Sequence, residues 1–142
     1  MKRLLLLCML SACGEPRPAP APAETQPPRS VTALEPVDAR TLRMRVSAPA
    51  GQALRLDNCN GAFSWGLEHP VDGAWKSAWI VATDACHSPP IVIAPGESRT
   101  FTEGITLSGE ERIAAGTYRI ALYGLHGAAE RTSQPFTLGA LP

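Results

Sequence analysis

Apolar and polar side chains alternate along several short stretches of this chain. In residues 41–47, Leu42, Met44 and Val46 stand between polar neighbours, and residues 53–57 repeat the pattern. Successive side chains of a β-strand point to opposite faces of its sheet, so this period predicts strands that bury one face. The same residues on a helix would be scattered around its axis.

Turn residues separate further stretches of this kind. Asn60-Gly61 and Asp72-Gly73 favour tight turns because these residue types tolerate positive φ, and Pro95-Gly96 suits a type II turn. Further strands are expected at 63–67, in two ragged pieces around Trp75 and 78–83, and at 91–93, 99–107, 116–123 and 136–138. Seven or eight short strands without a convincing helix predict an all-β fold, a single antiparallel β-sandwich.

The first thirteen residues have the composition of an export leader. Lys2 and Arg3 precede an apolar run from residue 4 to residue 10, and the small Ser11 and Ala12 come directly before Cys13. The stretch Leu10-Ser11-Ala12-Cys13 resembles the lipobox of bacterial lipoproteins. The resemblance implies that residues 1–12 are removed as a signal peptide. It also implies that the thiol of Cys13 takes a diacylglycerol and that its amino group takes a fatty acid such as palmitate.

Other interpretations of the leader are weaker, although an ordinary secretory signal cut nearby stays open. A helix that spans a bilayer needs roughly 20 apolar residues, and only about ten are available. Cys8 is a poor lipid acceptor because bulky Leu7 precedes it. The resemblance therefore implies a lipid-anchored protein of the bacterial cell envelope. Gly14 stands where such proteins carry an inner-membrane retention Asp, which favours the outer membrane, facing the periplasm.

A proline-rich segment follows the leader. Six prolines fall between residues 16 and 28, with few side chains that a core could bury. Such a segment extends at about 3.1 Å per residue, so it could hold a folded domain roughly 50 Å from a membrane. We expect residues 13–36 to form the lipidated cysteine and a disordered tether, and residues 37–142 to form the sandwich domain.

The charge balance argues against one class of partner. The sequence has 13 basic and 13 acidic side chains. Loss of Lys2 and Arg3 would leave a slightly acidic chain without a basic cluster. A nucleic-acid partner is therefore not expected.

Cys59 and Cys86 would be the remaining cysteines of an exported, lipidated chain. In an oxidising compartment such a pair is expected to form a disulfide, and closing this loop would stabilise the fold by about 3–4 kcal/mol. The alternative is a metal site of Cys59, Cys86, His87 and His69. Adjacent Cys86 and His87 would point to opposite faces of a strand, so we expect no metal and no other cofactor.

Four segments carry a second resemblance, in the order Leu56-Asp57-Asn58, Trp75, residues 94–98 and residues 115–120. They resemble markers of bacterial secreted immunoglobulin-like domains, and the bacterial intracellular proteinase inhibitor family shows a loosely similar order. The resemblance implies an immunoglobulin-like sandwich in which Tyr118 forms a tyrosine corner by bonding back to the preceding connection. The chain departs from antibody domains at Ile120, where those domains carry their second core cysteine.

The three tryptophans differ in their expected roles. Trp65, on the clean stretch 63–67, is expected in the core. Trp75 and Trp79 have more irregular surroundings and could be partly exposed, where they would stack on sugars or anchor a protein partner. A core or covering role for both is the favoured interpretation.

Basic side chains and loops give further candidate contacts. Arg43, Arg45 and Arg55 fall on the polar faces of strands that we expect to be adjacent, where they would form a small basic patch. The loops 88–90 and 124–134 are candidates because loops on a rigid sandwich commonly bind partners.

No enzyme motif is found in the sequence. Ser64 lies on an expected strand and out of register for a nucleophile elbow, and His69, His87 and His126 lie in expected turns or loops. We therefore expect a non-enzymatic binding module, a monomer held to the membrane by its lipid, with an unidentified envelope protein or glycan as partner. The alternatives are a proteinase inhibitor, on the resemblance, and a glycan-binding module that uses Trp75 and Trp79.

Overall fold

The computed structural model describes residues 29–83, 88–128 and 130–141. The strands in these ranges are β1 (Val31–Ala33), β2 (Thr41–Ser47), β3 (Leu54–Leu56), β4 (Trp65–Val71), β5 (Ala74–Val81), β6 (Ile91–Ile93), β7 (Ser98–Gly104), β8 (Gly116–Leu122), β9 (Leu125–His126) and β10 (Phe136–Leu138). The same ranges contain no helix, and hence none that could cross a bilayer. The prediction of an all-β fold is confirmed. The leader and the proline-rich run up to residue 28 lie outside the described residues.

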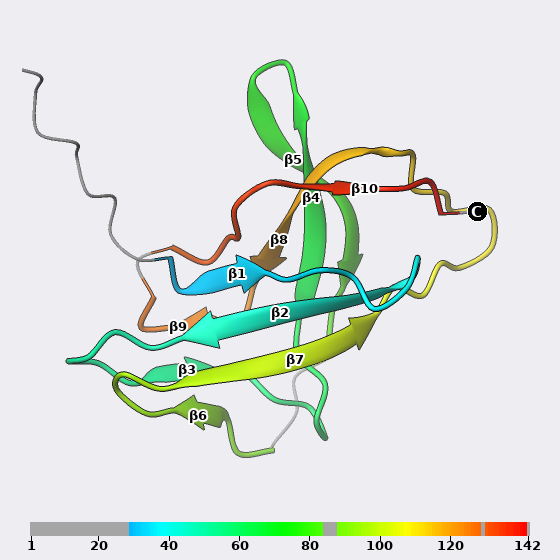
Figure 1. The fold of residues 1–142 in the computed structure, drawn as a ribbon. Helices are drawn as coiled ribbons and strands as arrows, with labels where there is room; N and C mark the ends of the chain where they lie inside the picture. The colour runs from blue at the N-terminus through cyan, green and yellow to red at the C-terminus, as the bar shows by residue number, and fades with distance from the viewer. Residues whose placement is uncertain (1–28, 84–87, 129, 142) are drawn as a thin grey trace, which may run out of the picture.

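The strands form a β-sandwich of antiparallel sheets. One side is a four-stranded sheet in the order β10-β8-β4-β5, and the three-stranded sheets β1-β2-β7 and β6-β3-β9 complete the structure. Figure 1 shows β2 and β7 running across the steeper β4, β5 and β8. Buried residues from all three sheets belong to one core cluster, as the predicted sandwich requires.

The core follows the alternation of the sequence. Leu42, Met44 and Val46 of β2 are at most 1% exposed. On β8, Tyr118, Ile120 and Leu122 are buried on the side that faces them across the sandwich. Burying each such side chain stabilises the fold by about 1.5–3 kcal/mol before the entropy cost of ordering the chain.

The three expected turns are present. Asn60 and Gly61 have φ of 54° and 97°, and the residues that flank them exchange two backbone hydrogen bonds. Asp72 and Gly73 have φ of 51° and 79° and join β4 to β5. Gly96 has φ of 77°, and the N–H of Glu97 donates to the carbonyl of Ala94, as in a type II turn.

The hydrogen bond expected of Tyr118 is also present. Its hydroxyl donates to the backbone carbonyl of Ala114 at 2.7 Å, which fixes the connection that enters β8. Burial raises the pKa of the Tyr118 phenol, so the hydroxyl keeps the proton that it donates.

The domain starts earlier than expected. β1 lies inside the segment 13–36 that was assigned to the tether, yet it pairs with β2 over Val31–Ala33, and Val31 is fully buried. The boundary between residues 36 and 37 is therefore wrong. The strand has only three residues, too few for a period to be read from the sequence.

The hairpin of β4 and β5 is longer and more regular than expected. β5 is one strand, where two ragged pieces were expected, because a bulge opposite Leu67 and Glu68 absorbs one extra residue and restores the pairing. Pro70 is accommodated because this end of β4 pairs only with β5. The tip of the hairpin extends beyond β10 in Figure 1. The loop expected at 124–134 also contains a strand, β9.

Candidate binding surface

Trp79 does not form the exposed stacking surface suggested as one possibility. Its side chain is 7% exposed, and its ring packs edge-on against Trp65 with centroids 4.9 Å apart. The indole Nε1–H donates to the backbone carbonyl of Thr106 at 3.2 Å. Because Trp79 is directly opposite Leu67 in the sheet, both side chains point into the core, so the glycan surface of Trp75 with Trp79 is not formed.

Trp75 lies on the opposite, outward side of the same sheet and is half-buried. The guanidinium of Arg119 on β8 stacks over its ring, with Cζ 4.6 Å from the centroid. Arg119 also donates from Nε to Oε2 of Glu68 on β4 at 2.7 Å, and its Nη2 forms an ion pair with the same oxygen at 2.7 Å. The stack and the ion pair hold Trp75 and Glu68 in fixed positions relative to each other.

A second aromatic ring lies further along the same outward side. Tyr123 is 38% exposed and Ile80 is 50% exposed, and both neighbour Gly66 on β4. A Cβ added at Gly66 would lie 3.2 Å from a ring carbon of Tyr123 and 2.5 Å from the backbone oxygen of Trp79. The ring of Tyr123 therefore lies close against a backbone position that has no side chain.

These residues share one side because of strand alternation. Gly66, Glu68 and Pro70 alternate with buried residues on β4, and their partners in β5 and β8 include Ile80, Trp75 and Arg119. We call this surface the outer aromatic face and define it by Gly66, Glu68, Trp75, Ile80, Arg119 and Tyr123. The backbone rows of Gly66 and Pro70, which lie beside Tyr123 and Trp75, are four residues apart, about 13 Å along the strand.

The basic patch expected from three arginines is split. Arg43 and Arg45 are exposed on β2, whose partners are β1 and β7. Arg55 is on β3, which pairs with β6 and β9. The strands that carry the arginines were expected to be adjacent, but β2 and β3 belong to different sheets, and the continuous patch was a wrong prediction.

The two candidate loops meet at one end of the sandwich. The N–H of Asp57 donates to the carbonyl of Gly124, and the carboxylate of Asp57 contacts Nε2 of His126 at 3.0 Å. The side-chain amide of Asn58 donates to the carbonyl of Pro89 at 2.9 Å. Asp57 and Asn58 therefore connect the segment at 88–90 with the segment that follows β8.

Cys59 lies at this same end of the sandwich, where it pairs with Ala62 across the turn. The expected disulfide partner, Cys86, falls within residues 84–87, outside the described residues, so the disulfide itself stays a prediction. The Asn60 N–H donates to Ser88 Oγ at 3.2 Å. Asn60 directly follows Cys59, and Ser88 is two residues after Cys86 in the sequence.

The other candidate groups are separated from one another. The ring of His69 stacks on Tyr118 at 6.0 Å, on the inner side of the hairpin. Ser64 exchanges a hydrogen bond with the Thr83 hydroxyl at 2.9 Å. His87 and Cys13 lie outside the described residues, and the residues that are described include no group of three His, Cys, Asp or Glu side chains that could hold a metal ion.

Sequence reasoning missed three residues of the outer aromatic face: Tyr123, Ile80 and Arg119. Tyr123 was placed at the end of a strand without a role, and Ile80 was one residue of a ragged strand piece. Their shared side depends on the bulge in β5 and on the order of β8, β4 and β5. A Gly flanked by strand residues at Gly66 was the one available signal, because such a glycine marks a close approach.

The comparisons with known proteins add no relative. No family model matches the chain, and neither a curated protein nor a solved structure matches it.

Proposed function

We propose that this protein is a lipid-anchored binding module of the bacterial cell envelope, non-enzymatic and monomeric, at the outer membrane facing the periplasm. The observation that carries the proposal is the order of segments: a short apolar leader ending at Cys13, a proline-rich run, and a sandwich that begins with β1. A lipid at Cys13 would bind the membrane, the proline-rich run would act as a spacer, and the sandwich would contact the partner.

The outer aromatic face is the surface best suited to that contact. Tyr123 and Ile80 are exposed on a sheet that the core holds rigid, and the stacked Arg119 fixes Trp75. Exposed aromatic side chains with few rotatable bonds lose little entropy when a partner covers them. This supports recognition by a preformed surface, with no rearrangement of the domain.

The lipid anchor can be tested directly. The protein is expressed in a bacterial host, and the amino-terminal peptide of the purified chain is analysed by mass spectrometry beside a Cys13→Ser variant. We expect a peptide that starts at Cys13 with added acyl mass, and recovery in the membrane fraction that the variant loses. An intact leader, or a free amino terminus at residue 13 or 14, would contradict the anchor.

We also propose that Cys59 pairs with Cys86. The hydrogen bonds of Asn58 and Asn60 to Pro89 and Ser88 support this pairing, because they hold the two cysteine-bearing segments together. A non-reducing peptide map is expected to contain the crosslinked peptides, and free thiol at Cys86 in the mature chain would refute the pairing.

Inhibition of a proteinase is a second candidate, favoured by one observation. The segment at 88–90 is held from behind by the side chains of Asn58 and Asn60, and a loop fixed before binding loses less entropy when a proteinase binds it. Titration of common serine proteinases with the purified chain tests this candidate. No loss of proteolytic activity at a tenfold excess would remove it for those enzymes.

A further inference from the structure

The outer aromatic face has an order of chemical groups that indicates a class of ligand. Tyr123 and Ile80 lie at one end and Trp75 at the other, and the Arg119–Glu68 ion pair lies between them. A protein interface places its apolar anchors together near the centre, inside a polar rim. Here the polar groups are central and the rings are at the ends.

Small side chains surround the ion pair on this face. Gly66 has no side chain, and its outward neighbours across the sheet include Ala121. Ser77 is the partner of Glu68 on β5, and Thr117 is the partner of Thr137 on β10. An elongated ligand can therefore lie along the strands of this sheet and reach both rings.

The charges of the face cancel. Glu68 and Arg119 have side chains that are only 17% and 24% exposed, and they form an ion pair at 2.7 Å. A strongly charged ligand would have to compete with this pair for either group, at a cost in desolvation. An uncharged ligand with hydroxyl or amide groups can hydrogen-bond to the outward edges of both side chains and leave the pair intact.

We infer that the outer aromatic face binds a linear polysaccharide of uncharged sugar rings, such as the glycan strand of an envelope polymer. The apolar side of one sugar ring packs on Tyr123, that of a later ring packs on Trp75, and the hydroxyls between them meet Arg119 and Glu68. This inference rests on the proposed function, because it names the partner of the binding module.

The spacing along the face predicts how affinity depends on the length of the ligand. Tyr123 contacts the position of Gly66 and Trp75 is paired with Pro70, and these two rows are about 13 Å apart along the strand. A ligand that spans both rows needs several sugar rings, so affinity should rise with chain length. Trp65 and Trp79 are buried and Trp75 is half-buried. Protection of tryptophan fluorescence from acrylamide therefore reports on Trp75.

The test uses the full mature chain and oligomers of β-1,4-linked N-acetylglucosamine with one, two and six rings. We expect the six-ring oligomer to protect Trp75 from acrylamide and to bind at least tenfold more tightly than the two-ring oligomer. Tyr123→Ser should weaken binding at least tenfold, and Tyr123→Phe should retain it. Val92→Ser, at an exposed position of β6, is the matched control and should bind like the wild type. A thermal unfolding curve for each variant checks that it is folded.

Co-sedimentation with purified peptidoglycan sacculi gives a second measurement. Sedimentation that the six-ring oligomer competes away supports the inference. Sedimentation that the oligomer does not compete away indicates a peptide or protein contact and overturns it, as does equal affinity for two and six rings or the absence of any protection. These results are independent of the lipid analysis at Cys13, so failure of the anchor and failure of the glycan site can be told apart.

Discussion

The β1-β2-β7 sheet and the β10-β8-β4-β5 sheet are both antiparallel, and their outward sides differ in chemistry. On β1, β2 and β7 the outward rows hold Thr32, Arg45 and Thr100, and then Arg43 and Thr102. The outer aromatic face instead holds two aromatic rings, an exposed isoleucine and an ion pair over small residues. The first pattern keeps a sheet hydrated, whereas the second exposes apolar surface that a monomer usually avoids. The difference teaches that strand alternation decides which residues face out, and only the identity of those residues distinguishes a polar, hydrated side from one that exposes apolar rings.

One glycine from each sheet, Gly66 and Gly104, gives the largest contrast. Gly66→Ala should lower the free energy of unfolding by about 1–3 kcal/mol, because the new Cβ would meet the backbone oxygen of Trp79 at 2.5 Å. Gly104→Ala on β7 is the matched control, since no atom lies within 4 Å of its Cβ position. Urea unfolding of both variants measures the difference. Equal stability of the two would show that the sheet at Gly66 relaxes freely.

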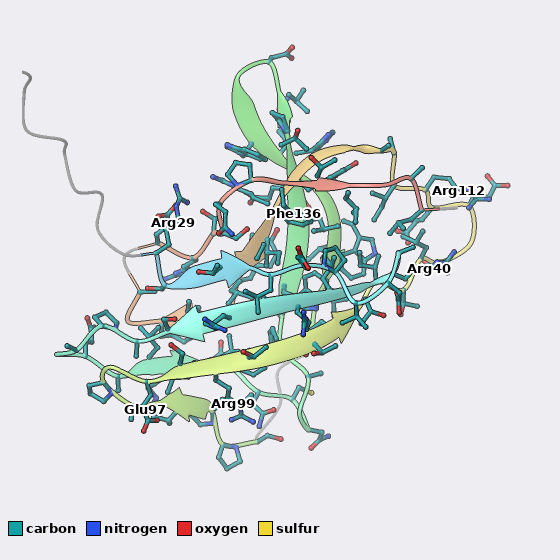
Figure 2. All side chains as sticks on the ribbon, viewed as in Figure 1. Arg29, Arg40, Glu97, Arg99, Arg112 and Phe136 are labelled. Atoms are coloured by element: carbon teal, nitrogen blue, oxygen red, sulfur yellow. The ribbon has the colours of Figure 1, made fainter. Side chains whose placement is uncertain are left out.

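The ion pairs give the next contrast. Arg119 and Glu68 form a hydrogen-bonded ion pair whose side chains are 24% and 17% exposed, whereas those of the Arg29–Glu130 pair are 34% and 42% exposed. A double-mutant cycle with Arg119→Ala and Glu68→Ala should give a coupling energy of about 1 kcal/mol, and the cycle on Arg29 and Glu130 should give less than about 0.5 kcal/mol. Figure 2 shows Arg29 at the end of the domain where the chain enters. A larger coupling energy for Arg29 and Glu130 than for Arg119 and Glu68 would contradict this prediction.

Substitutions on the outward side of β2 should have little effect on stability or on binding. Replacing Arg43 and Arg45 together with Ser should change the free energy of unfolding by less than about 0.5 kcal/mol, because both side chains are exposed. The same variant should sediment with sacculi as the wild type does. Loss of sedimentation would move the binding surface to the β1-β2-β7 side.

The smallest expected effect is a pH dependence at the edge of that sheet. Burial raises the pKa of Glu103 on β7 above its ordinary value of 4.5. The folded state therefore holds this proton more tightly than the unfolded state does, and that stabilisation is lost as pH rises from 4.5 through the raised pKa. Thermal melts across this window should show the wild type losing stability relative to Glu103→Gln. A constant difference between the two would contradict the shift.

Asp38 should act in the opposite direction and serves as the contrast for Glu103. The backbone N–H of Arg40 and then the hydroxyl of Thr41 donate to its carboxylate and lower its pKa. Its stabilising contribution is present above the ordinary pKa and lost as pH falls through the lowered value. Asp38→Asn should therefore be less sensitive than the wild type to acid below pH 4.

Much of the fold could be predicted from local pattern. The strand at 41–47, the strands at 91–93 and 136–138, and the three turns agree with the structure because their signals lie within a few residues. The missed elements depend on distant partners. β1 is a strand because β2 offers it an edge, and β9 is a strand because β3 does.

The outer aromatic face was predictable only in part. Trp65 lies in the core as expected, and of the other two tryptophans Trp79 has the favoured core role, whereas Trp75 is half-buried on the outward side. The bulge in β5 decides this, because it turns Trp79 inward and Trp75 outward. A bulge inserts one extra residue into a strand, so every side chain after it points to the opposite face of the sheet from the one that strict alternation would give.

The sequence by itself determined the all-β class, the positions of the turns and the residues of the core, because alternation and positive φ are properties of a few neighbouring residues. Only the tertiary structure decided that Tyr123, Ile80, Arg119 and Trp75 share one outward side. Strand order and register set which distant residues become neighbours, and these are fixed when the whole sandwich closes around its core.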